Sequence, residues 1–236
     1  PKFWPITNSS ELKSAMQEHG HLGILKKCTL GYDGKGQVRI KPGDNLDAAY
    51  KSLGTTDAIL EESVDFAAEV SFLVARNAKG GISHFPATLN VHNNGILAQS
   101  TAPAPLDEDI IAKGRNAVEK LAEALELFGL LALEAFVTQE GKLLFNEIAP
   151  RPHNSFHWTI EGCETSQFTQ LARLLAGMPF GATHTYGKWQ MDNLLGEDII
   201  NLPEILLTSG THVHIYGKTD AKPGRKMGHT NRPLGT

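Results

Sequence analysis

Cysteine is scarce in this chain, and a long apolar run is missing altogether. The two cysteines, Cys28 and Cys163, lie far apart and form no CxxC pair. This usage argues against a disulfide framework and fits reduced, structural thiols in the cytoplasm. No signal peptide and no apolar run of membrane length is present, so we expect no membrane partner.

The common nucleotide and zinc motifs are missing as well. The chain contains neither GxxxxGK[ST] nor GxGxxG, and it has no HExxH. His153 and His157 lie four apart, but Pro150 and Pro152 argue against the helix on which such a pair chelates zinc. The net charge of −4 gives the whole chain no electrostatic footprint for nucleic acid, so we expect no nucleic-acid partner.

Positive charge is nevertheless concentrated near the end of the sequence. Residues 217–236 contain five basic side chains and a single acidic one, Asp220. This asymmetry predicts a local anion site, and the alternative is a solvated basic segment. The basic residues are Lys218, Lys222, Arg225, Lys226 and Arg232.

The order of expected elements favours an α+β fold over a doubly wound parallel sheet, because helices alternate with antiparallel hairpins. A capping signal at residues 8–11 opens a helix that ends near Gly20. The clearest helix covers 109–128, with Gly129 as its stop. We expect further helices over 44–53 and 165–176, and strands over 22–28, 38–40, 58–64, 67–76, 82–91, 130–137, 143–149 and 212–216.

Two glutamates interrupt apolar runs on either side of a predicted hairpin turn at 139–142. A two- or four-residue loop places Glu134 opposite Glu147, with the Cβ atoms about 5 Å apart. A three- or five-residue loop separates the pair. Opposed carboxylates repel, and Mg²⁺ offsets that repulsion because it prefers oxygen ligands. The alternative is a raised pKa on one glutamate without a metal.

The same strand delivers Asn146 and then breaks at two prolines that bracket Arg151, with His153 and Asn154 directly after them. Polar and charged groups gathered at a strand end suit a site for metal and anions. Far upstream, residues 31–37 hold three glycines and a lysine between two strands, after Lys26. Such a loop offers backbone N–H groups to phosphates, although it is also an ordinary turn pattern. Together these features favour an ATP–Mg²⁺ site with a second anionic substrate.

At this point the chain resembles the ATP-grasp portion of the N5-carboxyaminoimidazole ribonucleotide synthases, a family of purine biosynthesis. The resemblance implies an ATP-grasp fold, in which two α+β subdomains clasp the nucleotide, with a small C-terminal β-rich domain. The implied divisions are 1–66 with the glycine-rich loop, 67–177 with the metal site, and 178–236. The matching segments are Gly31–Gln37, Asn146–Ser155, Thr165–Phe168, Tyr216–Lys218 and Pro223–His229, and the second is the most specific.

The implied activity is ATP-dependent carboxylation of 5-aminoimidazole ribonucleotide with bicarbonate, through carboxyphosphate. The products are N5-carboxyaminoimidazole ribonucleotide, ADP and phosphate. The resemblance also implies ATP and Mg²⁺ as cofactors and a cytoplasmic homodimer. Two alternatives stay open: another ATP-grasp carboxylate–amine ligase of purine biosynthesis, and a non-catalytic nucleotide-binding fragment.

The resemblance carries residue roles with it. It assigns binding of the ATP phosphates to Lys26, Gly31, Tyr32, Asp33, Gly34, Lys35, Gly36 and Gln37. Adenine is assigned to Glu61, Glu62, Ser63 and Val64, and the rest of the nucleoside to Glu69 and His92. Mg²⁺ is assigned to Glu134 and Glu147, with Asn146 beside them. The catalytic residues, which would face bicarbonate or the aminoimidazole, are Arg151, His153 and Asn154. Binding of the ribonucleotide phosphate is assigned to Lys218, Arg225 and Lys226.

The sequence departs from the family pattern in two respects. The family's N-terminal domain is absent from these 236 residues, so we expect the chain to be a piece of a longer enzyme. Leu30 and Phe156 stand where the family often has glycine. We expect these two residues to change local packing and to leave the chemistry unchanged.

Overall fold

The computed structural model describes residues 1–29 and 36–235. The predicted loop residues Gly31, Tyr32, Asp33, Gly34 and Lys35 therefore lie outside the described part of the chain. The chain divides into two compact units, Pro1–Asp65 and Phe66–Thr236. Within the described residues, no helix is long and apolar enough to cross a bilayer.

The first unit is a four-stranded antiparallel sheet packed against two helices. The strand order is β1 (Phe3–Ile6), β4 (Ala58–Glu62), β2 (Gly23–Lys27) and β3 (Gln37–Ile40), and the helices are α1 (Ser9–His19) and α2 (Leu46–Leu53). Alternating apolar residues of the strands, such as Leu25 and Leu60, meet Leu12 of α1 in a buried core. As predicted, Asn8 caps α1 by accepting a hydrogen bond from the N–H of Glu11.

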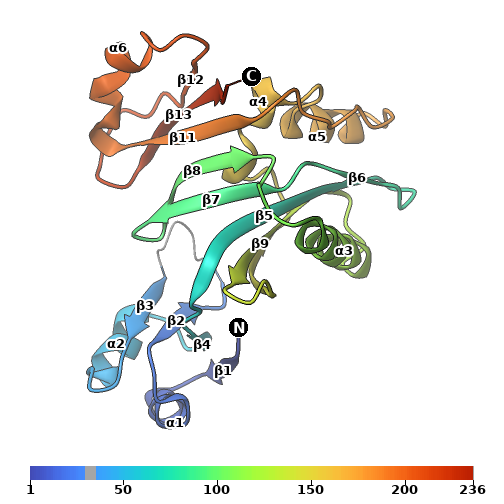
Figure 1. The fold of residues 1–236 in the computed structure, drawn as a ribbon. Coiled ribbons are helices and arrows are strands. Elements are labelled where there is room, and N and C mark those ends of the chain that lie inside the picture. Colours follow the sequence, from blue (N-terminus) through green and yellow to red (C-terminus); the bar gives the residue numbers. More distant parts are fainter. Residues whose placement is uncertain (30–35, 236) are drawn as a thin grey trace. The chain divides into compact units, whose positions relative to one another are not determined.

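The second unit is built on a nine-stranded antiparallel sheet (Figure 1). Its path runs β10-β9-β5-β7-β8-β11-β13-β12, and β6 pairs with β5 beside this path. This arrangement agrees with the predicted α+β class. The strands are β5 (Phe66–Arg76), β6 (Ile82–His84), β7 (Thr88–Asn93), β8 (Ile96–Ala102), β9 (Gly129–Thr138), β10 (Leu143–Ala149), β11 (Trp189–Leu195), β12 (His212–Ile215) and β13 (Lys226–Pro233).

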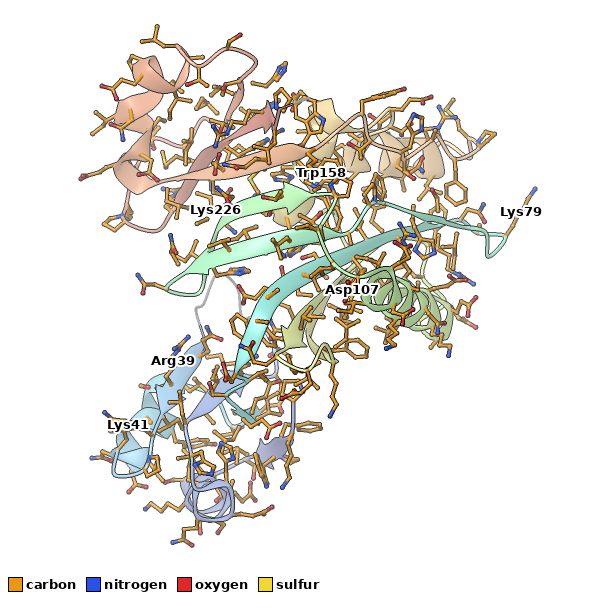
Figure 2. All side chains as sticks on the ribbon, viewed as in Figure 1. Arg39, Lys41, Lys79, Asp107, Trp158 and Lys226 are labelled. Carbon is orange, nitrogen blue, oxygen red and sulfur yellow. The ribbon has the colours of Figure 1, made fainter. Side chains whose placement is uncertain are left out.

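Helices cover the two faces of this sheet differently. The long helix α3 (Glu108–Ala124) lies against β5 and β9, where Phe72 and Leu133 pack on Val118 (Figure 1). The opposite face packs in part on two fully buried side chains, Phe156 and Trp158. Phe156 is the last residue of a short helix, and Trp158, labelled in Figure 2, directly precedes another. The remaining helices are η1 (Asn154–Phe156), α4 (Thr159–Gly162), α5 (Gln167–Leu175), η2 (Gly196–Asn201) and α6 (Leu202–Ile205). Phe156 is thus a core residue, and the expected change in local packing at this position stays a prediction.

Gly114 in α3 is a position where the packing leaves no room for a side chain. A Cβ atom there would lie 2.0 Å from Cζ of Phe72, whose ring is buried in the core. We expect Gly114→Ala to lower the free energy of unfolding by about 1–3 kcal/mol through overpacking, despite alanine's higher helix propensity. Urea unfolding beside Lys113→Ala, an exposed change one residue away, checks this. An increase in stability would contradict it.

Several expected elements need correction. The strand expected over 82–91 is two strands, β6 and β7, which both pair with β5, and Pro86 lies in the break between them. The helix expected over 109–128 ends at Ala124, and Glu126 adopts a positive φ of 47°, so Gly129 is the first residue of β9 and not the stop. The strands β1, β8, β11 and β13 were not predicted.

The basic C-terminal segment is also more ordered than its composition indicates. Residues 226–233 form β13, which pairs with β11 and β12 in the main sheet. Because β11 also pairs with β8, the part after 178 continues the sheet of the preceding part. The division into 1–66, 67–177 and 178–236 stays a prediction.

Candidate functional site

The hairpin of β9 and β10 opposes Glu134 to Glu147, but not by the predicted loop. The N–H of Thr138 bonds to the carbonyl of Lys142, which leaves a three-residue loop. Gly141 has the positive φ of 74° that such loops favour. This loop alone would separate the glutamates. A register shift between Phe145 and Glu147 inserts Asn146 as an extra residue and brings the two glutamates back into opposition.

Glu134 carries a charge that its surroundings do not favour. Its side chain is only 12% exposed, whereas Glu147 is exposed. Burial, and then the neighbouring charge of Glu147, raise the pKa of Glu134 to about 7. A raised pKa on one glutamate was the alternative to metal binding considered from the sequence. The two are compatible, because a cation bound beside Glu134 would offset the cost of its buried negative charge.

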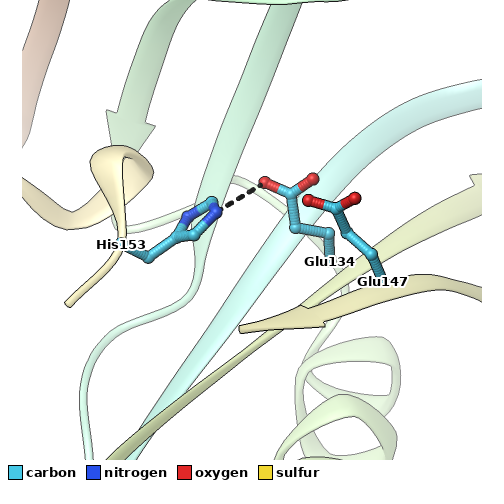
Figure 3. Close-up of side chains that lie close together, drawn as sticks. All are labelled: Glu134, Glu147 and His153. Atoms are coloured by element: carbon cyan, nitrogen blue, oxygen red, sulfur yellow. Dashed lines mark ion pairs between the residues drawn. The ribbon is translucent and has the colours of Figure 1, made fainter. Parts of the chain in front are cut away.

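His153 faces the same pair from the other side, as Figure 3 shows. Its Nε2 lies 3.5 Å from Oε1 of Glu134. Burial, and then the charge of Arg151, lower the pKa of His153 to about 3, so the imidazole is neutral. The N–H and the hydroxyl of Ser155 both approach Nδ1 of His153. Nδ1 is therefore the acceptor and Nε2 carries the proton that points at Glu134.

The side chains of Glu134, Glu147 and His153 fit a cation. One ligand atom from each lies within 4.8 Å of the others. Across residues 1–29 and 36–235, no other group of three such side chains comes this close. Two carboxylates suit a hard divalent cation, and the protonated Nε2 of His153 makes it an outer neighbour of the ion unless that proton is lost.

The loop that follows β10 is held by side chains from elsewhere in the sheet. Asn154 exchanges two hydrogen bonds with the side-chain amide of Asn193 in β11, and Asn193 also donates to the carbonyl of Leu97. The Arg151 side chain is exposed and donates one N–H to the carbonyl of Pro152. The structure therefore gathers the predicted catalytic residues at one strand end, next to the glutamate pair.

Glu69 and His92 are also brought together, on β5 and β7. Nδ1 of His92 donates to Oε2 of Glu69 at 2.7 Å. Burial opposes the protonated form of His92, but the hydrogen bond and charge of Glu69, helped by Glu134, outweigh it and raise the pKa of His92. The predicted nucleoside residues thus form one ion pair within this unit.

A ladder of buried polar side chains next to Glu134 was missed from the sequence. Ser71, which pairs with Glu134 across the strands, accepts from the amide of Asn90 at 2.6 Å. Ser100 in turn donates to Asn90. All three side chains are buried. Ser71 lies between Val70 and Phe72 and could have been noticed, but β7 and β8 hold several other polar residues, so Asn90 and Ser100 carried no distinct signal.

The predicted phosphate-binding residues do not act as one cluster. Lys226, labelled in Figure 2, is partly buried, and its charge acts on Glu134, His92 and His153. Lys218 is exposed and donates to the carbonyl of Lys226. Arg225 is exposed and turns toward Asp220, 4.0 Å away. Lys226 is therefore the member of this set that is coupled most directly to the carboxylates.

The remaining predicted site residues lie in the first unit. Nζ of Lys26 lies 2.5 Å from Oε2 of Glu61 across β2 and β4. Glu62 accepts from the N–H of Lys2, and the N–H of Ser63 donates to the carbonyl of Leu22. Val64 is partly buried just before the end of this unit. Of the predicted phosphate loop, Gly36 and Gln37 are described. Gly36 lies in a turn, and Gln37 is the first residue of β3.

Comparison with known proteins gives matches over nearly the whole chain. A family model of the ATP-grasp domain matches residues 1–168, and one of the phosphoribosylaminoimidazole carboxylase C-terminal domain matches residues 189–232. The N5-carboxyaminoimidazole ribonucleotide synthase of Brucella melitensis biotype 1 is 45% identical over 97% of this chain and 64% of that protein. The chain thus spans less than two thirds of the length of this relative.

Solved structures give the same picture. An ADP complex of an N5-carboxyaminoimidazole ribonucleotide synthetase has a TM-score of 0.91 at 41% identity, over 98% of this chain and 62% of that chain. The enzyme of Aspergillus clavatus in complex with ADP and 5-aminoimidazole ribonucleotide has a TM-score of 0.90 at 27% identity, over 100% of this chain and 64% of that chain.

Proposed function

We propose, on the premise that this chain belongs to the ATP-grasp family, that the protein containing it carboxylates 5-aminoimidazole ribonucleotide. The family match confirms the predicted ATP-grasp fold. The reaction consumes ATP and bicarbonate and yields N5-carboxyaminoimidazole ribonucleotide, ADP and phosphate. We place it in purine biosynthesis, in a cytoplasmic homodimer. The proposal is supported by the names of the relatives above and by the geometry of the glutamate pair.

The glutamate pair carries the proposal. Glu134 and Glu147 oppose each other at a strand end, and the pKa of Glu134 is raised to about 7. Glu134 and Glu147, with Asn146 beside them, would hold Mg²⁺, which when bound would neutralise phosphate charge. The structural core does not need this arrangement, since two opposed carboxylates lower stability when no cation accompanies them.

The residues after β10 suit the anionic partners of the reaction. In the proposed reaction, bicarbonate first accepts the γ-phosphoryl group of ATP, which gives carboxyphosphate and ADP. The exocyclic amine then captures the carboxyl carbon, or CO₂ released in place, and phosphate leaves. Arg151 offers a planar guanidinium for a carboxylate or bicarbonate. His153 and Asn154 offer fixed donors on the same strand end, which positions reactants without covalent help from the protein.

Lys26, Gly31–Gln37, Glu61–Val64, Glu69 and His92 remain our proposed nucleotide-binding residues. Lys26 offers a point charge to phosphate, as lysines do in other nucleotide sites. Carboxyphosphate reacts readily with water, so a site that excludes water is expected for this chemistry. Lys218, Arg225 and Lys226 remain our proposed residues for the ribonucleotide phosphate, with Lys226 joined electrostatically to Glu134.

A substrate test separates this function from the alternatives. Phosphate release is measured with ATP and 5-aminoimidazole ribonucleotide in the presence of bicarbonate, and with formate or glycine and their own amine substrates. We expect release only with bicarbonate and the aminoimidazole together. Release with formate or glycine would assign the protein to another carboxylate–amine ligase. ATP binding without any release would indicate a non-catalytic nucleotide-binding protein.

Replacing Arg225 is expected to weaken ribonucleotide binding selectively. Arg225→Ala removes one proposed phosphate partner from an exposed segment, so KM for 5-aminoimidazole ribonucleotide should rise about tenfold, as loss of one charge-assisted contact allows. Lys222→Ala is the matched control, because Lys222 is an exposed cation that also faces Asp220. Steady-state kinetics with each substrate varied checks this. A change confined to KM for ATP would refute the phosphate assignment.

A further inference from the structure

Gln167 is completely buried, and both the oxygen and the nitrogen of its side-chain amide bond to the loop that carries the proposed catalytic residues. Its Oε1 accepts the N–H of His153 at 2.8 Å, and its Nε2 donates to the carbonyl of His153 at 2.8 Å. His153 has extended backbone angles, φ −116° and ψ 144°. The amide of Gln167 therefore pairs with His153 as a neighbouring strand would.

The backbone of the loop between β10 and His153 has few N–H groups that could bond to other elements. Pro150 and Pro152 lack N–H groups, and Arg151 bonds only locally, through its N–H to the carbonyl of Ala149. The first N–H after the two prolines is that of His153, and Gln167 takes it. Gln167 thus contacts the loop backbone at its first free N–H, while the Asn154–Asn193 pair holds the next side chain.

Gln167 is itself held in place by other buried groups, so it can fix the position of the loop backbone. It is the first residue of α5, its N–H donates to the hydroxyl of Thr159, and that hydroxyl donates to the carbonyl of Phe156. Its second Nε2 hydrogen points to Nδ1 of His157 at 3.0 Å. His157 is thereby held with Nδ1 as acceptor, and burial lowers its pKa to about 4, so the ring is neutral.

We propose that Gln167 is a positioning residue of the ligase site. It fixes the His153 backbone, and through it the direction of the His153 imidazole toward Glu134 and of Asn154 toward Asn193, so that both meet the anionic substrate in one geometry. This role requires no contact with substrate or metal, because the amide of Gln167 is bonded to His153 and His157. This inference rests on the proposed function for its kinetic effect, but the contact itself does not.

The chain contains a matched control on the same helix. Gln170 is also fully buried, and its amide clamps the N–H and carbonyl of Gly181 in the same two-point manner. Gly181 is far from Glu134 and Glu147 in the sequence and is not among the proposed site residues. Gln167→Leu and Gln170→Leu thus remove equivalent buried clamps, one at the site and one elsewhere, and should lower the melting temperature similarly.

The test compares these variants in the intact protein. For Gln167→Leu we expect kcat/KM for bicarbonate to fall about 100-fold, the cost of a small misplacement, with KM for ATP unchanged. Gln170→Leu should keep both constants near wild type. Gln167→Met is a second variant of similar size: it fills the buried volume, loses the acceptor for His153 N–H and both donors, and should show the same kinetic loss with a folded protein.

A readout without catalysis accompanies the kinetics. In ¹⁵N-histidine NMR spectra, Gln167→Leu should alter the neutral tautomer signal of His157, and Gln170→Leu should not. Equal kinetic behaviour of the two leucine variants, or an unchanged His157 signal in Gln167→Leu, would overturn the positioning role. If the wild-type protein itself forms no ADP with bicarbonate and the aminoimidazole, the proposed function fails, while the NMR comparison still decides the contact.

Discussion

Glu147→Ala is expected to abolish ADP formation while the protein stays folded. The Glu147 side chain is exposed and lies beside a bulge, so its removal leaves no cavity and breaks no core contact. It takes away one of two carboxylates in the proposed metal site. Loss of an outer-shell partner costs about 10–100-fold, and loss of a direct ligand should exceed 100-fold. ADP release in a coupled assay, beside thermal melting followed by circular dichroism, measures both parts.

Glu140→Ala provides the control for this experiment. Glu140 lies in the loop of the same hairpin, is exposed, and accepts a hydrogen bond from the hydroxyl of Thr138. Its loss should leave ADP formation unchanged. Near-normal turnover in Glu147→Ala would remove the metal role, and a loss of turnover that only follows unfolding would show that Glu147 is structural.

The opposition of the two glutamates shows what the sequence can predict here. The two apolar runs and the glycine between them were enough to predict the hairpin. Loop length could not be fixed, and the two- and four-residue loops were wrong. The outcome was right because Asn146 bulges and compensates for the three-residue loop. A bulge changes the pairing by one residue without disturbing the apolar pattern that a sequence displays.

The strand β13 was missed for a physical reason. β13 runs through His229, Thr230 and Asn231, which are polar but buried, and Asn231 bonds to the carbonyl of His157. Their burial is stabilised by tertiary hydrogen bonds that a binary pattern of apolar and polar residues does not contain. The same holds for Gln167, whose role depends on a loop that lies next to it only in the folded chain.

Helix limits failed for a related reason. The helix expected to reach residue 128 ends at Ala124, although Leu125 and Leu127 continue an apolar pattern. Leu127 packs against the α3 core after the chain has turned, which Glu126 permits by its positive φ. Apolar periodicity therefore marked the burial of Leu127 but not the exposure of Leu125, and it did not mark the end of the helix.

Glu134→Gln is expected to make the metal-free protein more stable at pH 8. Burial and Glu147 raise the pKa of Glu134 from 4.5 to about 7, so the folded state binds this proton more tightly than the unfolded state does. The unfavourable charge is absent below pH 4.5, grows as the pH rises toward 7, and is complete above it. At about 1.4 kcal/mol per pKa unit, the full effect is on the order of a few kcal/mol.

Glutamine keeps the size of the side chain and removes the charge, so urea unfolding with a chelator should give Glu134→Gln higher stability than wild type at pH 8 and a small difference at pH 5. Added Mg²⁺ should stabilise the wild type at pH 8, because a ligand that binds only the folded state shifts unfolding by mass action. It should not stabilise the variant. Glu140→Gln, a fully exposed change in the same hairpin, should show neither effect. If Glu134→Gln were instead destabilised equally at both pH values, the carboxylate at 134 would stabilise the fold through its contacts. That result would contradict the metal-binding role of Glu134.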